Sequence, residues 1–281
     1  MNRPVGIFDS GVGGISIALG VRKILPSEDL LYVADQEFSP YGSKSNTIVE
    51  ARAEIITTFL SQQGCKAIVV ACNTATVNSI NRLRTMCSIP IVGVEPGIKP
   101  AALQSNTGII GVLATEKTLS SESFQALRSQ FSAAVNIEIQ ACPRFVELVE
   151  KNNLNSVETL KIAEDYVLPL IAKGADHIVL GCTHYSFLTP VIEQIVGDKA
   201  TIIDTAIPVS LELKRQLSRR DLLNPQDRQG LTKFWSSKAS EQASEKISQL
   251  WGNKVVVADL NLHKDKTVSK SNHISLKQRD C

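Results

Sequence analysis

Two short stretches of this chain repeat one pattern, and they constrain the fold more than any other feature. Residues 67–74 (AIVVACNT) and 177–184 (HIVLGCTH) each pass from an apolar run through a small residue to a cysteine and polar residues. A continuous apolar run is typical of a buried parallel strand, and in open α/β sheets the chemistry lies just past the strands' carboxyl ends. We therefore predict that Cys72 and Cys182 each stand between a strand and a helix. On two related lobes they would face one substrate from opposite sides.

The composition is that of a soluble globular protein with room for two domains. The 281 residues are 43% hydrophobic and 21% charged, with a formal net charge of +2, which does not favour a nucleic-acid-binding surface. No apolar run reaches the ~20 residues that span a bilayer, and the N-terminus lacks a signal-peptide core. We expect a cytoplasmic protein that binds neither nucleic acid nor membrane.

The six cysteines do not follow a metal-binding or disulfide pattern. No C-x-x-C pair occurs, so we predict no metal site, and a large core makes a disulfide scaffold unnecessary. Cys65, Cys87 and Cys142 are predicted to be small buried hydrophobic residues. Cys281 is predicted to be a loose thiol in the tail.

Apolar runs alternate with helical periodicity along most of the chain, which predicts α/β lobes with mostly parallel sheets flanked by helices. Strands are predicted at residues 3–8, 30–34, 90–94, 107–113, 135–141, 175–180, 200–203, 230–235 and 254–258, with another leading to Cys72. Helices are predicted at residues 15–25, 48–63, 73–86, 98–103, 118–131, 157–173, 188–196, 207–217 and 240–250. The polar residues 261–281 are predicted to be a disordered tail.

A glycine-rich turn follows the first strand, at residues 9–14 (DSGVGG). It does not fit a nucleotide-binding motif, because Ser16 stands where the dinucleotide fingerprint needs its third glycine and no Gly-Lys-Ser/Thr follows. Two interpretations remain open. The glycines let the backbone and a helix N-terminus approach a small anion, or the turn is merely tight and Asp9 caps it.

A pair of thiols on opposite sides of one carbon suits the inversion of a stereocentre. One thiolate removes a proton from one face and the other thiol returns a proton to the opposite face, with a free thiol titrating near ~8.5. His184 could hold or relay the proton of Cys182, and Asp9 ends a strand that could lie beside the Cys72 strand. Neutral groups that suit an amino-acid carboxylate or ammonium are Ser10, Asn73, Thr74 and Thr183.

Three further residues admit two interpretations each. Tyr41 lies in a turn-rich loop, residues 39–45, where it could cover a site or simply pack its ring. Glu147 and Glu150 lie one turn apart on a helix predicted after Pro143. A solvated surface carboxylate is the ordinary interpretation of both.

Five motifs, taken as a set, resemble the glutamate racemases of bacteria, cofactor-independent members of the aspartate/glutamate racemase superfamily. The resemblance covers about residues 4–217 in the family's order. The motifs are GIFDSGVGG at 6–14, PYG at 40–42 with Lys44 and Ser45, ACNTA at 71–75, CPRFVELVE at 142–150 and LGCTHY at 180–185.

The resemblance implies two α/β lobes related by a pseudo-two-fold axis, with the active site in the cleft between them. Lobe 1 would comprise residues 1–97 and 208–260, and lobe 2 residues 98–207. It implies interconversion of L- and D-glutamate without pyridoxal phosphate or metal, as a supply of D-glutamate for peptidoglycan synthesis.

The resemblance also implies residue roles. Cys72 would be the base for D-glutamate, assisted by Asp9, and Cys182 the base for L-glutamate, assisted by His184 and Glu150. The implied substrate-binding residues are Asp9, Ser10, Tyr41, Gly42, Asn73, Thr74, Thr183 and His184. Glu147 and Ser186 depart from the family, since proline is common at both positions. These departures could alter loop shape near Cys182 but remove no proposed catalytic group.

Other functions remain open from the sequence. One alternative is a racemase of the same superfamily that acts on aspartate or a hydantoin. Another is a catalytically silent paralogue that binds an acidic amino acid, against which the presence of both cysteines argues. A homodimer is also left open, because a dimer surface would look like ordinary scattered apolar residues.

Overall fold

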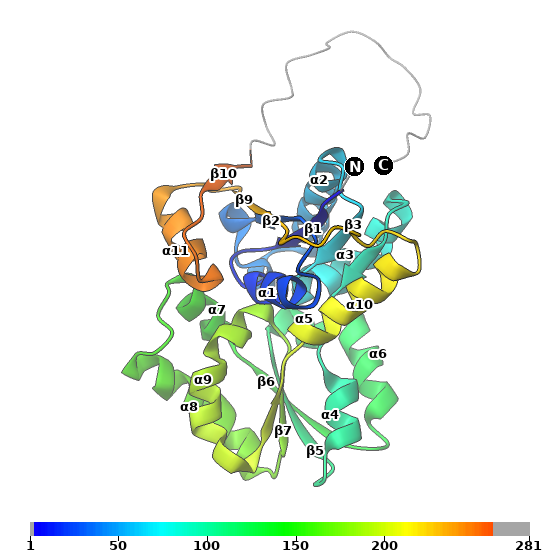
Figure 1. Ribbon diagram of the computed structural model, residues 1–281. Helices are drawn as coiled ribbons and strands as arrows, with labels where there is room; N and C mark the ends of the chain where they lie inside the picture. Colours follow the sequence, from blue (N-terminus) through cyan, green and yellow to red (C-terminus); the bar gives the residue numbers. More distant parts are fainter. Residues whose placement is uncertain (1–2, 261–281) are drawn as a thin grey trace.

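The computed structural model describes residues 3–260, and the strands of this part form two parallel sheets flanked by helices (Figure 1). One sheet has six strands in the order β10-β9-β2-β1-β3-β4, and the other has four in the order β6-β5-β7-β8. The predicted α/β class is confirmed. The strands are β1 (Val5–Asp9), β2 (Leu30–Ala34), β3 (Ala67–Val70), β4 (Ile91–Gly93), β5 (Ile109–Ala114), β6 (Asn136–Ala141), β7 (His177–Leu180), β8 (Thr201–Ile203), β9 (Thr232–Ser236) and β10 (Val257–Asp259).

The two sheets share one four-strand topology. In the first sheet β1 lies between β2 and β3, with β4 beyond β3; in the second β5 lies between β6 and β7, with β8 beyond β7. Strands β3 and β7 are therefore equivalent, and every residue of both is buried. The similarity of the two sequence stretches thus reflects a repeated unit of structure.

Helices and short 3₁₀ turns connect the strands. The helices are α1 (Ile15–Ile24), α2 (Asn46–Gln62), α3 (Asn73–Met86), α4 (Ile98–Gln104), α5 (Glu116–Ser120), α6 (Glu122–Phe131), α7 (Pro143–Glu150), α8 (Val157–Ala172), α9 (Thr189–Val196), α10 (Ala206–Ser218) and α11 (Glu241–Trp251). The 3₁₀ turns are η1 (Gln36–Phe38), η2 (Tyr41–Ser43), η3 (Thr183–Leu188) and η4 (Gly197–Lys199).

One predicted helix is wrong. Residues 118–131 were expected to form a single helix, but α5 and α6 meet at Ser121, whose backbone is extended (φ −72°, ψ 145°). The Ser121 hydroxyl accepts a hydrogen bond from the Phe124 amide at 3.2 Å, so this serine caps a new helix instead of continuing the old one.

Alternation along the strands divides the apolar residues among three cores. Val69 of β3 belongs to a core that also contains Ile178 and Leu180 of β7, so this core connects the two sheets. Ile68 and Val70, which point the other way from β3, enter a second core on the far face of the six-stranded sheet. The third core covers the corresponding face of the four-stranded sheet. The predicted burial of Cys65, Cys87 and Cys142 is confirmed, whereas Cys281 lies outside the described residues.

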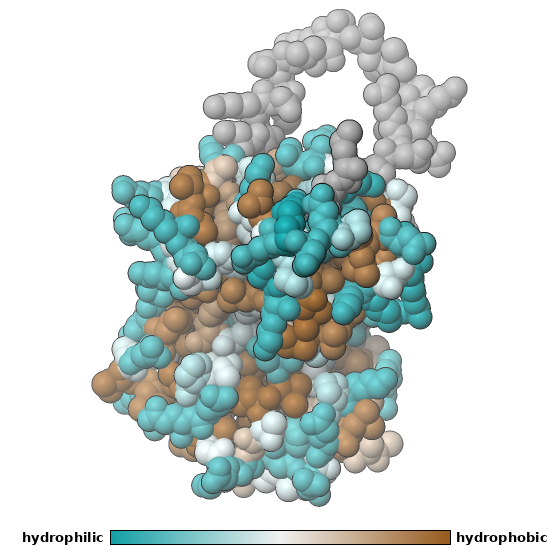
Figure 2. Space-filling view, viewed as in Figure 1, coloured by the Kyte–Doolittle hydropathy of each residue, from teal (hydrophilic) through white to brown (hydrophobic). Residues whose placement is uncertain are grey.

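Exposed large hydrophobic side chains are scattered over many elements. The visible face in Figure 2 accordingly mixes hydrophilic and hydrophobic residues. The most exposed are Val157 (86%), Val256 (83%) and Leu103 (75%), which lie on different segments. No helix within residues 3–260 has the length and apolar character needed to cross a bilayer.

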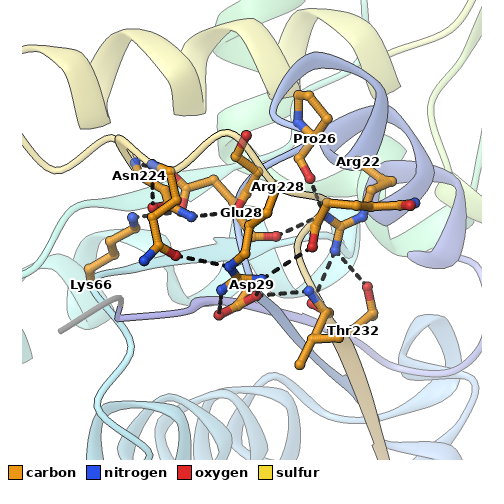
Figure 3. Close-up of polar contacts among 12 residues, drawn as sticks. Arg22, Pro26, Glu28, Asp29, Lys66, Asn224, Arg228 and Thr232 are labelled. Carbon is orange, nitrogen blue, oxygen red and sulfur yellow. Dashed lines mark hydrogen bonds and ion pairs between the residues drawn. The ribbon is translucent and has the colours of Figure 1, made fainter.

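The chain returns to the first sheet near the end of the described part. Strand β9 pairs with β2. A polar network holds the segment before β9 at the amino-terminal ends of the strands, opposite their carboxyl ends (Figure 3). In this network Lys66 forms a buried ion pair with Glu28 at 2.6 Å, and Glu28 accepts from the Asn224 amide at 2.8 Å. Arg228 pairs with Asp29 at 2.8 Å.

The domain boundaries stay a prediction, and the tail predicted at 261–281 lies outside the described residues.

Candidate active site

Cys72 and Cys182 occupy equivalent positions, two residues beyond the last residues of β3 and β7. Cys72 caps α3, and its sulfur accepts from the Ala75 amide at 3.4 Å. Cys182 precedes the 3₁₀ turn η3, so a tight turn stands there where a regular helix was expected. The cysteines are 6% and 8% exposed.

Cys72 has the environment of a protonated thiol. Burial, above all, and then the neighbouring carboxyl of Asp9 raise the pKa of Cys72 well above its ordinary value, because both disfavour a thiolate. The thiol donates to the Ser10 hydroxyl at 3.8 Å. A thiolate at Cys182 would act in the same direction.

Cys182 lies at the head of a relay of three side chains. Its sulfur is 3.8 Å from His184 Nδ1, and His184 Nε2 is 2.9 Å from Glu150 Oε1. Burial would lower the pKa of His184, but its hydrogen bonds to Cys182 and Glu150 prevail and hold the pKa well above its ordinary value. Burial would conversely raise the pKa of Glu150, but the contacts with His184, the Val12 amide and Lys246 keep it below normal. These surroundings therefore favour the imidazolium form of His184, which lies between a sulfur and a carboxylate.

Asp9 connects the end of β1 with the turn that follows β7. One carboxyl oxygen accepts from the Gly11 amide at 2.9 Å and the other from the Thr183 hydroxyl at 3.3 Å. Burial raises the pKa of Asp9, although the positive charge of His184 opposes this rise. The end of β1 in one sheet and the turn that follows β7 in the other therefore meet at this side chain.

The glycine-rich turn at residues 9–14 leaves no room for a side chain at two of its glycines. A Cβ at Gly11 would lie 2.0 Å from Glu150 Oε1, and one at Gly13 would lie 2.2 Å from His184 Nδ1. The Val12 amide donates to Glu150 Oε1 at 3.0 Å. The turn is tight and Asp9 caps it through the Gly11 amide, as one interpretation expects, and its Val12 amide also reaches the carboxylate of the protein's own Glu150. Binding of a small anion at this turn stays a prediction.

The other predicted binding residues lie around this centre. Asn73 and Thr74 form the buried first turn of α3, where the Asn73 side-chain oxygen has no hydrogen-bond partner within the described residues. Tyr41 donates its phenol proton to Asp35 at 2.6 Å, so its hydroxyl is directed away toward that carboxylate. A Cβ at Gly42 would lie 3.5 Å from Thr115, at ordinary contact distance.

Thr115 and Thr118 are candidate residues that the sequence analysis missed. Thr115 Oγ1 lies 3.2 Å from Thr74 Oγ1 and 3.0 Å from Thr118 Oγ1, and both threonines are buried. The repeat could have revealed Thr115, because it follows β5 at the position where Ser10 follows β1.

The two glutamates of α7 differ in environment. The Glu147 side chain is 61% exposed and lies 3.9 Å from Lys151, as expected for a surface carboxylate. Glu150 is only 19% exposed and contacts His184. A hollow of about 240 Å³ beside Glu150 is lined by α7 and by residues 36–40. Within residues 3–260, no group of three or more His, Cys, Asp and Glu side chains could hold a metal ion.

These features define an acid–base enzyme built on two repeated α/β units, with one thiol after an equivalent strand of each. Comparisons with known proteins identify its relatives. The family model described as Asp/Glu/hydantoin racemase matches residues 16–207. A glutamate racemase from Herpetosiphon aurantiacus is 46% identical over 236 residues, or 84% of this chain and 93% of that protein.

Solved structures agree with the sequence relatives. A glutamate racemase isoform from Bacillus anthracis has a TM-score of 0.82 at 29% identity, over 92% of this chain and 97% of its own. A glutamate racemase from Francisella tularensis, solved in complex with D-glutamate, has a TM-score of 0.81 at 26% identity, over 93% and 98%. The chain belongs to the glutamate racemases of the Asp/Glu/hydantoin racemase family, which are isomerases that act on amino acids.

Proposed function

We propose that this chain interconverts L- and D-glutamate by proton transfer between two thiols and the α-carbon. Cys182 removes the α-proton of L-glutamate while Cys72 returns a proton to the opposite face, and the roles reverse for D-glutamate. The observation that carries the proposal is the burial of both thiols at equivalent strand ends that meet at Asp9. The D-glutamate bound by the Francisella relative supports the choice of substrate.

The protonation states suit the reaction from L- to D-glutamate. Cys72 keeps its proton because its pKa is raised, so it is the donor, and Asp9 lies beside it. His184, held by Glu150, faces the sulfur of Cys182 and stabilises the state in which this sulfur accepts the α-proton. One turnover moves one proton onto Cys182 and one off Cys72, and the reverse reaction restores the starting state.

Polar groups would bind the substrate around these thiols. The unpaired side-chain oxygen of Asn73 suits the ammonium group, since ammonium donates and amide oxygen accepts. Hydroxyl and backbone donors suit the carboxylates. The residues we assign to binding are Asp9, Ser10, Tyr41, Gly42, Asn73, Thr74, Thr183 and His184, with Tyr41 and Gly42 acting through their backbone.

The direct test is racemisation followed by circular dichroism. The chain should convert either enantiomer of glutamate to an equal mixture, and in D₂O it should place deuterium at the α-carbon. Turnover of aspartate or a hydantoin in place of glutamate would redirect the substrate assignment. Binding of glutamate without deuterium exchange would instead indicate a silent binding protein.

Replacing either thiol tests the two-base mechanism. Cys72→Ser and Cys182→Ser should each lower kcat by roughly 10³-fold or more, because a hydroxyl titrates far too high to act as the base. Both variants should keep the wild-type melting temperature, since serine fills almost the same volume. Full racemisation by either variant would contradict the assignment.

The D-glutamate formed would supply peptidoglycan synthesis. Expression of the chain should restore growth to a bacterium that requires D-glutamate, and the Cys72→Ser variant should not. A homodimer stays part of the proposal, and sedimentation with and without glutamate would measure the oligomeric state.

A further inference from the structure

The carboxylate of Glu150 has partners from three separate elements. Its Oε1 atom accepts from the Val12 amide at 3.0 Å and lies 2.9 Å from His184 Nε2. Its Oε2 atom lies 3.6 Å from Nζ of Lys246. The mechanism above uses the contact with His184 and assigns no part in proton transfer to the lysine.

Lys246 reaches the site from a distant part of the chain. It lies on α11, between the last two strands of the six-stranded sheet, whereas Glu150 ends α7, which follows β6 of the other sheet. A second contact lies nearby, since the side chain of Asn152, two residues beyond α7, donates to Gln249 Oε1 of α11 at 2.6 Å. Figure 1 shows α11 beside α7, where these contacts bring the two sheets' helices together.

Burial distinguishes this ion pair from a surface pair. The Lys246 and Glu150 side chains are 25% and 19% exposed, and the His184 side chain is 2% exposed. Water screens charges less at such sites than at the surface. Lys151 is 74% exposed and lies near Glu147 instead. Within residues 3–260, the cations paired with Glu150 are thus His184 and Lys246.

We propose that Lys246 is a positioning residue for racemisation, which fixes the Glu150 carboxylate toward His184 and so couples α11 to proton transfer at Cys182. The inference rests on the proposed function. With Oε2 held by the lysine, Oε1 stays aligned with both the Val12 amide and the imidazole. The carboxylate then holds His184 as the imidazolium that faces the sulfur.

The charge of Lys246 also has a predictable effect on pH dependence. The groups that face Glu150 are His184 from η3, the Val12 amide, Lys246 from α11 and, at longer range, the carboxyl of Asp9 and the phenol of Tyr32 from β2. Of these, His184, Val12 and Lys246 favour the ionised form of Glu150. Removal of the lysine should therefore let Glu150 keep its proton to higher pH, and the active form should be lost earlier as the pH falls.

The test compares Lys246→Met with Lys246→Arg and with Lys254→Met. Methionine keeps the apolar stem and removes the charge, arginine keeps the charge, and Lys254 is an exposed lysine just beyond α11. We expect Lys246→Met to lower kcat/KM by roughly threefold to tenfold and to move its acid limb to higher pH. Lys246→Arg should restore most of both, and Lys254→Met should match the wild type.

The two directions of reaction provide an internal check. Because enantiomers are equally stable in solution, kcat/KM for L- and D-glutamate must fall by the same factor, while kcat and KM can change separately in each direction. Melting temperatures of all variants should be measured alongside.

Three outcomes would overturn the inference. The first is an unchanged kcat/KM and acid limb in Lys246→Met alongside normal wild-type turnover. The second is a loss of activity that tracks a lowered melting temperature, without a displaced acid limb or rescue by arginine, which would indicate a merely structural contact. The third is absence of racemisation by the wild-type chain, which would overturn the proposed function together with this inference.

Discussion

Asp9 shows how a single residue exchanges stability for reactivity. Its carboxyl group is fully buried, and its hydrogen-bond partners do not offset the loss of hydration, so its pKa is raised. A buried carboxylate with a raised pKa destabilises the fold when it is ionised, and this cost is absent at pH values where it is protonated in both folded and unfolded states.

We therefore predict that Asp9→Asn makes the protein more stable and less active. An asparagine can accept from the Gly11 amide and donate to the Thr183 hydroxyl, so both contacts survive. Urea unfolding at pH 8 should show a gain of roughly 1 to 2 kcal/mol, and kcat should fall about ten- to hundredfold. The gain should shrink as the pH falls toward the ordinary aspartate value near ~3.9. A variant less stable than the wild type at pH 8 would argue that the carboxylate is stabilising.

Sequence patterns locate the site residues that have a local signal and miss those whose place depends on contacts between distant segments. Cys72, Cys182 and Asp9 end apolar runs, so local pattern alone brings them to one edge of a sheet. Glu150 has no such local signal, since its burial depends on contact with Val12, 138 positions away. Lys246 is likewise an ordinary helix lysine until the fold brings α11 to α7.

Helices and strands match the bounds predicted from the sequence where they are buried. They differ from the prediction where a polar side chain forms a hydrogen bond with a backbone amide. The strand β2 has the predicted bounds, and all five of its residues are buried. The break between α5 and α6 was missed because Ser121 bonds the Phe124 amide, which periodicity does not reveal. The turn after Cys182 is 3₁₀ and not α-helical, although its sequence resembles that after Cys72.

The turn between β1 and α1 leaves no room for a side chain at Gly13, and a substitution at this position tests whether the enzyme needs that close approach to be active. Gly13→Ala would put a methyl group 2.2 Å from His184 Nδ1, so the imidazole or the turn itself must shift. A displacement of about 1 Å in such a relay costs roughly a hundredfold in rate, and we expect a fall in kcat of that order. Circular dichroism should report an unchanged fold. Wild-type turnover by Gly13→Ala would mean that His184 is not held where the relay needs it.

For the molecule as a whole, the clearest target for a stability measurement is the polar network around Lys66 and Glu28. This network holds the segment before β9 against the six-stranded sheet. Lys66 and Glu28 are 4% and 2% exposed, so loss of one partner leaves a buried charge alone. Lys66→Met should lower the free energy of unfolding by about 3 to 5 kcal/mol.

The double variant Glu28→Gln with Lys66→Met is the matched control. It should recover much of that loss, because the glutamine still accepts from the Asn224 amide and no charge remains. The folded double variant should racemise normally, since the network lies at the opposite edge of the sheet from the thiols. A double variant as unstable as Lys66→Met would place the cost in packing rather than in charge.

The order in which the strands occur along the chain has a consequence for synthesis on the ribosome. The four-stranded sheet has all its strands once Ile203 has emerged, whereas β2 must wait for residues 232–236 before its outer edge is paired. While residues 35–231 are being translated, a nascent chain therefore carries an open strand edge at β2, which closes only when β9 arrives.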